Sequence, residues 1–123
     1  MARLREETLN RVETFADRVL DVAEAIDKQG RFARIIDQMA GSGTSVGANV
    51  FEADQAMTPK DFVKTLGVVV KELNETKHWL RLVVRRKWIR QSRLAGLLSE
   101  TNELLSIFNT MILRTRRRAK QTK

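Results

Sequence analysis

Apolar residues recur at intervals of three or four positions through four long stretches of the chain. The first stretch shows the pattern clearly at Leu9, Val12, Phe15 and Val19. This spacing places the apolar side chains on one stripe of an α-helix, and no stretch shows the alternation typical of a strand. The pattern predicts helices at residues 9–29, 32–56, 58–86 and 92–114.

Short connections between long helices favour antiparallel packing of neighbours. The sequence therefore predicts an all-α fold, an antiparallel up-down-up-down four-helix bundle over residues 9–114. Residues 1–8 form a charged N-terminal lead. Residues 115–123 form a basic C-terminal tail, which we expect to fray from Thr115 because it is polar.

Several residues mark the expected ends and breaks of these helices. Gly30 supplies a break, because glycine readily takes the left-handed conformation that ends a helix. Thr58 and Pro59 are typical of an N-cap followed by the first helical position, and Ser92 is the predicted cap of the fourth helix. The segment 41–47 contains three glycines, each unfavourable by up to about 1 kcal/mol relative to alanine. Either the chain breaks there, or the small residues let another helix come close.

Composition limits the class of protein. The chain has 123 residues, 42% of them hydrophobic, which suits the core of one domain. It has no cysteine, which excludes disulfides, thiolate nucleophiles and Cys-ligated zinc. No apolar run is long enough to predict a transmembrane helix, and the charged N-terminus is unlike a signal peptide. We therefore expect a cytoplasmic protein that does not enter a membrane.

Charge is distributed unevenly along the chain. Residues 1–59 contain 7 Lys/Arg and 10 Asp/Glu, whereas residues 60–123 contain 16 and 5, and the net charge is +8. The basic residues form two clusters, which an antiparallel bundle would place at opposite poles. The first cluster consists of Arg81, Arg85, Arg86, Lys87, Arg90 and Arg93, and the second of Arg114, Arg116, Arg117, Arg118, Lys120 and Lys123.

Guanidinium groups bind phosphates bidentately, so the two clusters favour a polyanion as partner. Trp88 lies within the first cluster, where it could stack on an unpaired base. The alternative is a solubilising tail with cations that stabilise helix C-termini. Trp79 and Trp88 are expected to anchor either the core or a subunit contact.

Residues that could support catalysis are sparse. His78 is the only histidine, so neither a zinc-binding histidine pair nor a Ser-His-Asp arrangement can be argued. Glu75-x-x-His78 occurs once, whereas a di-iron bundle needs that motif on two helices. The glycines at 41, 43 and 47 lack the spacing and the preceding strand of a dinucleotide-binding loop. We expect no metal, no cofactor and no enzymatic activity, and a bundle-type metal enzyme is the least favoured alternative.

The second predicted helix also carries a recognisable motif. Gln38-Met39, Ser45-Val46, Asn49-Val50 and Glu52 resemble the signature Q-I-x-R-A-x-x-S-I-x-x-N-I-x-E-G of the four-helix bundle family named for the 23S rRNA intervening-sequence protein. Further similar segments are Asp61-Phe62-Val63, Glu72-Leu73-x-Glu75-Thr76-x-x-Trp79-Leu80, and residues 97–108. The resemblance covers about residues 10–113.

The resemblance implies an up-down bundle that can assemble into a ring-like homopentamer. The family includes proteins encoded within ribosomal RNA insertions. It also includes the accessory variability determinant of diversity-generating retroelements, a basic pentamer that binds nucleic acid and a reverse transcriptase. The chain departs from the signature at Gly41, where arginine is usual, and at Ala53, where glycine is usual. The first change puts in doubt any role that needs a cation on this helix.

The signature residues carried over are Gln38, Ser45, Asn49 and Glu52, which share one helical face. If they are buried together, they form an interhelical hydrogen-bond network, and this is the interpretation that we favour. If they are exposed, they line an interface or a ligand site.

The leading functional hypothesis is a non-enzymatic nucleic-acid-binding accessory protein for RNA or DNA. It would act as a homo-oligomer, with a pentamer and a reverse transcriptase partner implied by the retroelement branch. The alternative is a protein–protein interaction scaffold with no direct role in nucleic-acid binding.

Overall fold

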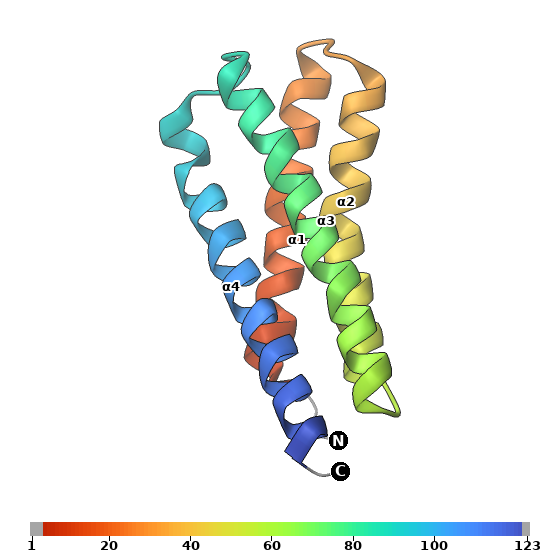
Figure 1. Ribbon diagram of the computed structural model, residues 1–123. Helices are drawn as coiled ribbons and strands as arrows, with labels where there is room; N and C mark the ends of the chain where they lie inside the picture. Colours follow the sequence, from red (N-terminus) through yellow and green to blue (C-terminus); the bar gives the residue numbers. More distant parts are fainter. Residues whose placement is uncertain (1–3, 122–123) are drawn as a thin grey trace.

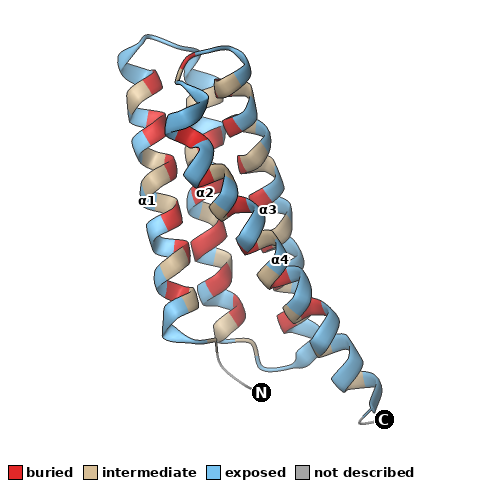
Figure 2. Cartoon of the chain, turned by 90° about the vertical axis from the view of Figure 1, so that its left-hand side faces the viewer, coloured by how far each residue is buried: buried red, intermediate tan, exposed pale blue. Residues whose placement is uncertain are grey.

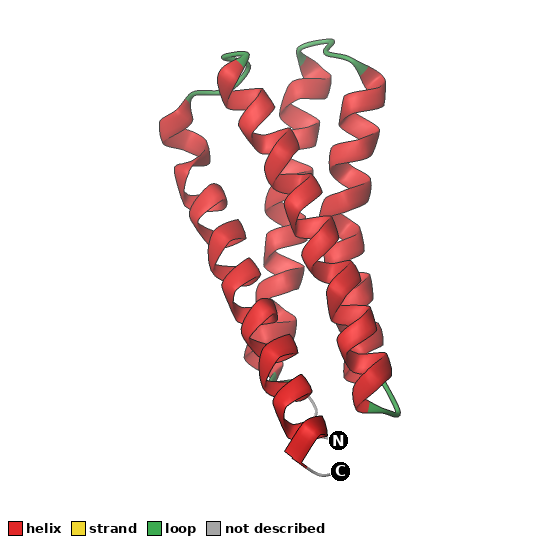
Figure 3. Cartoon of the chain, viewed as in Figure 1, coloured by secondary structure: helices red, strands yellow, loops and turns green. Residues whose placement is uncertain are grey.

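The computed structural model describes residues 4–121 and contains four helices in that range. Helix α1 spans Glu6–Lys28, α2 Ala33–Asp54, α3 Pro59–Arg85 and α4 Gln91–Gln121. The described part of the chain has no strand (Figure 3). Residues 1–3 of the predicted lead and Lys123 of the second basic cluster lie outside the described residues. The predicted all-α four-helix bundle is confirmed.

The helices run alternately up and down, so the two ends of the bundle differ in what they hold (Figure 1). The α1–α2 and α3–α4 connections lie at the upper end of the bundle in Figure 1. The α2–α3 connection lies at the lower end, near both termini. Each helix packs against the next in sequence, and the contact between α1 and α4 is the smallest of the helix–helix contacts in the described chain.

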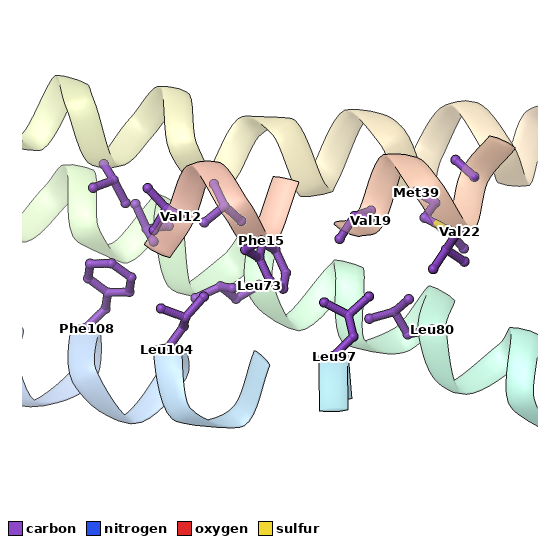
Figure 4. Packing of buried hydrophobic residues seen from close by; sticks show 14 of the residues in the cluster. Val12, Phe15, Val19, Val22, Met39, Leu73, Leu80, Leu97, Leu104 and Phe108 are labelled. Atoms are coloured by element: carbon purple, nitrogen blue, oxygen red, sulfur yellow. The ribbon is translucent and has the colours of Figure 1, made fainter. Parts of the chain in front are cut away.

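The apolar stripes of all four helices meet in one core. Phe15 of α1, Met39 of α2, Leu73 of α3 and Phe108 of α4 are fully buried there. Figure 4 shows these side chains converging, and Figure 2 shows buried residues along the inner side of each helix. Burying one such side chain stabilises the fold by roughly 1.5–3 kcal/mol. The bundle is therefore held by packing more than by helix propensity.

Helix α2 continues through its glycine-rich segment without a break, which settles the choice between a break and close packing. A Cβ atom added at Gly43 would lie only 2.6 Å from Cγ1 of Val19, so glycine is needed there for α1 to approach. A Cβ at Gly41 would meet nothing within 4 Å. Beside Gly43, the buried Ser42 receives a hydrogen bond of 2.8 Å from the hydroxyl of Thr76 on α3. Contacts on both sides of α2 thus offset its poor helix propensity.

The two predicted N-caps have different outcomes. The hydroxyl of Thr58 accepts a hydrogen bond of 3.1 Å from the amide of Asp61, with Pro59 at the first helical position, so this cap is confirmed. The predicted cap at Ser92 is wrong. Helix α4 begins at Gln91, one residue earlier, and therefore includes Ser92 in its first turn.

Helix α1 ends in a Schellman motif, which confirms the break at Gly30. The amide of Arg31 donates to the carbonyl of Ile26 at 3.2 Å, and the amide of Gly30 donates to the carbonyl of Asp27 at 2.9 Å. Gly30 has φ +72°, the left-handed conformation that this motif requires.

Helix α3 ends in the same motif, but with lysine in the glycine position. The amide of Trp88 donates to the carbonyl of Val83, and the amide of Lys87 donates to the carbonyl of Val84, both at 3.0 Å. Lys87 has φ +60° and is the only non-glycine residue with positive φ in the described chain. An L-residue in this conformation costs about 1–2 kcal/mol, so the α3–α4 connection contains local strain.

Both chain ends are more helical than the sequence suggested. Helix α1 begins at Glu6, inside the predicted lead. Helix α4 continues to Gln121, so the expectation that the tail frays from Thr115 is wrong over the described residues. The hydroxyl of Thr115 donates to the carbonyl of Met111 at 2.8 Å, and the helix continues past it without a break.

An ion pair joins α1 and α4, where the helices otherwise touch least. Two nitrogens of Arg11 donate to the two carboxylate oxygens of Glu100, at 2.6 and 3.1 Å. The same guanidinium lies 3.0 Å from Glu103. The hydrogen bond to Glu100 raises the pKa of Arg11 above its usual value, although desolvation opposes the rise. Arg11 and Glu100 are about three-quarters shielded from solvent, which strengthens this pair relative to a surface pair.

Candidate nucleic-acid interface

The upper end of the bundle collects basic residues from both of its connections. We call residues 27–34 and 85–93 the upper pole. It contains eight Lys/Arg and a single acid, Asp27. The eight cations are Lys28, Arg31, Arg34, Arg85, Arg86, Lys87, Arg90 and Arg93.

Contacts around Trp88 join the two connections into one surface. The side-chain amide of Gln29 donates to the carbonyl of Trp88 at 2.9 Å. The guanidinium carbon of Arg31 lies 5.1 Å from the centre of the Trp88 ring, which is a cation–π distance. The Phe32 ring lies 6.2 Å from the Trp88 ring, centre to centre, at an interplanar angle of 32°. The α1–α2 connection therefore rests on the α3–α4 connection.

The cations of the upper pole face solvent. All eight are exposed, and none of them forms an ion pair with an acid in the part of the chain that the structure describes. Arg81, the remaining member of the first predicted cluster, is also exposed, near the end of α3. Cations without an acidic partner are available to bind anions, and Arg31, whose Nε donates to Gln29 at 2.9 Å, keeps its remaining N–H groups for this.

The structure adds three cations to the first predicted cluster. Lys28, Arg31 and Arg34 belong to the first half of the sequence, whose net charge is negative, so charge summed along the chain did not point to them. The signal that could have found them is topological. In an up-down-up-down bundle, the first and third connections share one end.

The stacking role considered for Trp88 is wrong, because only 7% of this residue is exposed. Trp88 belongs to the core, as one of the two predicted alternatives stated. Phe32, which lies against it, is 66% exposed. Trp79 is half-buried, and its indole nitrogen lies 3.4 Å from a carboxylate oxygen of Glu75.

The second predicted cluster lies at the opposite end of the molecule. Arg114, Arg116, Arg117, Arg118 and Lys120 are exposed on the last turns of α4. These turns extend beyond the other helices in Figure 2. Helix α3 has 27 residues and is therefore about 40 Å long at 1.5 Å per residue. The two clusters are thus separate sites, as the antiparallel topology predicted.

The signature residues do not form the buried network that we favoured. Gln38 and Glu52 are exposed, whereas Ser45 and Asn49 are half-buried. The side-chain amide of Asn49 donates to the backbone carbonyl of Ser45 at 2.9 Å, so this hydrogen bond stays within α2. These four residues share one face of α2, and that face lies beside the buried stripe of the helix instead of within it. Their face is open for an interface or a ligand.

The described residues contain no group of three or more His, Cys, Asp or Glu side chains that could hold a metal ion. His78 is exposed on α3, with its ring against Trp79. Burial raises the pKa of the Glu72 carboxyl; the charge of Glu75 adds to this rise, and Lys71 opposes it. Two interacting carboxylates with no further ligand do not make a metal site.

A groove of about 200 Å³ opens between α1 and α4 below the upper pole. Its floor is apolar and includes Val22 and Leu97, while Arg18, Asp21 and Arg93 lie at its edges. The groove holds one acid and no histidine, cysteine or hydroxyl nucleophile, so it offers two cations to an anion but no acid–base pair for a reaction.

None of the helices among the described residues is long and apolar enough to cross a membrane.

Comparison with known proteins places the chain in a family. The family model described as 23S rRNA-intervening sequence protein matches residues 6–110. A solved structure from Bacteroides thetaiotaomicron, of a protein with unknown function from the S23 ribosomal protein family, is similar in fold with a TM-score of 0.80. It is 30% identical in sequence, over 85% of this chain and 97% of that one. A comparison with curated proteins found no match. Because the family model matches most of the length of the chain, the chain belongs to the 23S rRNA-intervening sequence protein family.

Proposed function

We propose that the protein is a non-enzymatic accessory protein that binds nucleic acid through the upper pole. The observation that carries this proposal is the density of exposed, unpaired cations there, eight with one acid. Each phosphate that such a surface neutralises releases counterions, which drives binding. Membership of a family named for an rRNA insertion makes structured RNA the first probe to test, with DNA as its comparison.

Binding should depend steeply on salt and weakly on sequence. Exposed cations on long side chains contact the phosphate backbone, which carries no sequence information. Fluorescence anisotropy with a labelled RNA hairpin and a DNA duplex, at about 50 mM salt and above, measures this dependence. Absence of binding to both probes at the lowest salt would refute the proposal.

Charge removal at the upper pole tests the location of the site. Replacing Arg85, Arg86, Arg90 and Arg93 with Gln removes four exposed cations. We expect weaker binding. The slope of the logarithm of the binding constant against the logarithm of the salt concentration should become smaller in magnitude by about 3, since each phosphate contact contributes about 0.7–0.9.

The matched control removes the same charge from the lower end. Its substitutions are Arg114→Gln, Arg116→Gln, Arg117→Gln and Lys120→Gln, all at exposed positions of α4. A larger loss of affinity in this control than in the upper-pole variant would move the site to the C-terminal end of α4.

We propose further that the protein acts as a homo-oligomer. Symmetry would multiply the phosphate contacts of one upper pole, so that individually weak contacts add through avidity. The pentamer is the form that the family resemblance implies. Light scattering of the purified protein gives the number of subunits, and a monomer at concentrations that bind nucleic acid would exclude this part of the proposal.

The retroelement branch of the family supplies a finer hypothesis, in which the partner is a reverse transcriptase. A reverse transcriptase gene next to the one for this chain would support that branch. Copurification of the two proteins after nuclease treatment tests the contact directly.

The second candidate function is a protein–protein interaction scaffold, and the signature face favours it. Gln38, Ser45, Asn49 and Glu52 lie at or near the surface of α2, where core packing does not require them. A pull-down that recovers one stoichiometric protein after nuclease treatment, and loses it when Gln38 and Glu52 are replaced by Ala, would favour the scaffold.

A further inference from the structure

We propose that Phe32 is a platform on which an unpaired base of the bound nucleic acid stacks. This inference rests on the proposed function and makes it more specific, because it assigns single-stranded segments or loops, and not continuous duplex, as the ligand of the upper pole. The argument combines the exposure of the Phe32 ring, its support from below, and the charges beside it.

Phe32 is the most exposed aromatic residue of the described chain. Its exposed fraction is 66%, against 42% for Phe51, the other aromatic residue among the exposed large hydrophobics. Single exposed apolar side chains are common, and Phe32 differs from them because its ring lies against Trp88 on a surface rich in cations. The ring belongs to the upper pole through its contact with Trp88, and Phe32 is next to Arg31 in the chain and two positions from Arg34.

The ring is supported on its inner side and open on its outer side. Trp88 lies beneath it, almost completely buried, and is itself held by Gln29 and Arg31. The backbone of Phe32 is fixed as well, because its carbonyl accepts from the amides of Ile35 and Ile36 at 3.0 and 3.2 Å. A base that stacks on this ring therefore meets a surface that is already in place, which limits the ordering cost of binding.

Charge complementarity identifies the occupant. A nucleotide presents a flat apolar ring and a phosphate within one unit, and the upper pole presents an aromatic ring among eight cations. Bases tolerate such stacking regardless of sequence, because every base has a π-face. A paired base inside a duplex is covered on both faces by its neighbours, so the base that stacks on Phe32 is unpaired.

Replacement of the ring tests the proposal. The probes are a labelled oligoadenylate of about 12 nucleotides and a blunt DNA duplex of the same length. This length lies within the range of site sizes of single-strand binders. Phe32→Ala should weaken oligoadenylate binding by about fivefold or more, with little change for the duplex. Phe32→Trp should retain the affinity. Phe51→Ala removes an exposed ring from α2 outside the upper pole and should change neither affinity.

A spectroscopic readout separates stacking from a general effect on the fold. An oligoadenylate with 2-aminopurine at one position should change its fluorescence on binding the wild-type protein, and not on binding Phe32→Leu at saturating concentration. Circular dichroism establishes that each variant folds. The substituted side chain is exposed and its backbone bonds remain available, so folding should persist.

The outcomes distinguish this inference from the proposed function. If the wild-type protein binds neither probe and does not bind the RNA hairpin, both fail. If it binds the hairpin or the duplex but not the oligoadenylate, the base platform alone is refuted. If it binds both probes and Phe32→Ala weakens neither, or weakens both equally, the base platform is refuted and the electrostatic proposal stands. If Phe32→Ala lowers the number of subunits measured by light scattering, the ring is a contact between copies, and the platform is refuted in that way.

Discussion

The left-handed lysine at the end of α3 gives a prediction in which stability and binding move in opposite directions. Gly30 and Lys87 occupy the same position of the same C-terminal motif, with φ +72° and +60°. Only the glycine adopts this conformation without strain. Lys87→Gly removes a penalty of about 1–2 kcal/mol from the folded state. The flexibility of glycine in the unfolded chain returns about 0.5–1 kcal/mol of that gain.

The net effect is a stabilisation of about 0.5–1 kcal/mol. For a chain of this size, that corresponds to a rise in Tm of about 2–4 °C. Affinity should move the other way, because Lys87 is one of the exposed cations of the upper pole. Loss of one phosphate contact would lower the log–log salt slope by about 0.7–0.9.

The control variant separates charge from backbone strain. Lys87→Gln removes the charge and keeps a side chain in the left-handed position. It should lose as much affinity as Lys87→Gly while gaining none of its stability. Thermal unfolding by circular dichroism and anisotropy at several salt concentrations measure both properties.

Two results would refute this reasoning. If Lys87→Gly and Lys87→Gln have the same Tm, backbone strain at this position is negligible. If Lys87→Gly is more stable and binds nucleic acid as tightly as the wild-type protein, the lysine is not kept for binding. A reverse experiment at the other connection supplies a check. A Cβ atom added at Gly30 would have no neighbouring atom within 4 Å. We therefore expect Gly30→Ala to destabilise the fold by about 1 kcal/mol through the backbone conformation alone.

Three further predictions concern the bundle itself, and thermal unfolding measures each. Gly43→Ala should lose about 1–3 kcal/mol of packing against α1, whereas Gly41→Ala, which meets no neighbour, should gain about 0.5–1 kcal/mol; equal stability of the two would contradict the packing argument. Glu100→Gln should destabilise by about 1–2 kcal/mol, and Glu103→Gln, whose side chain is 60% exposed, by less than about 0.5 kcal/mol. Glu72→Gln should raise Tm at pH 7 and leave it unchanged below pH 4.5. The pKa of Glu72 is higher in the folded than in the unfolded state, so ionisation of this carboxyl destabilises the wild-type fold as the pH rises above 4.5. A higher Tm of the variant that persists at low pH would point to packing instead of charge.

Most of the fold could be predicted because its determinants are local or periodic. The stripes of apolar residues, the break at Gly30 and the cap at Thr58 each depend on residues within one or two turns. The glycine-rich part of α2 was ambiguous, because its stability depends on Val19 and Thr76, which are distant in the sequence. The helical end of α4 is not evident from the sequence, because a polar and basic composition is typical of a frayed end.

The candidate site was predicted only in part, for a related reason. A charge cluster within one segment, such as Arg85 with Arg86, is visible in the sequence. The pairing of Phe32 with Trp88 joins residues 56 positions apart, and the sequence does not say which ring is covered. Trp88 has the larger ring system, so its burial removes more apolar area from water than burial of the smaller Phe32 ring would.

The arrangement of helices explains why an aromatic ring and so many cations meet at one end. In an antiparallel bundle of four helices, the first and third connections must lie together, so each can contribute half of a surface. The segment around the α1–α2 connection contributes Phe32 and three cations, and the segment around the α3–α4 connection contributes the ring beneath and five cations. Both connections end their helix with the same tight motif, and the buried Trp88 ring anchors the surface between them to the core. The bundle therefore acts as a rigid support, and the chemistry of its upper pole can vary with little effect on the fold.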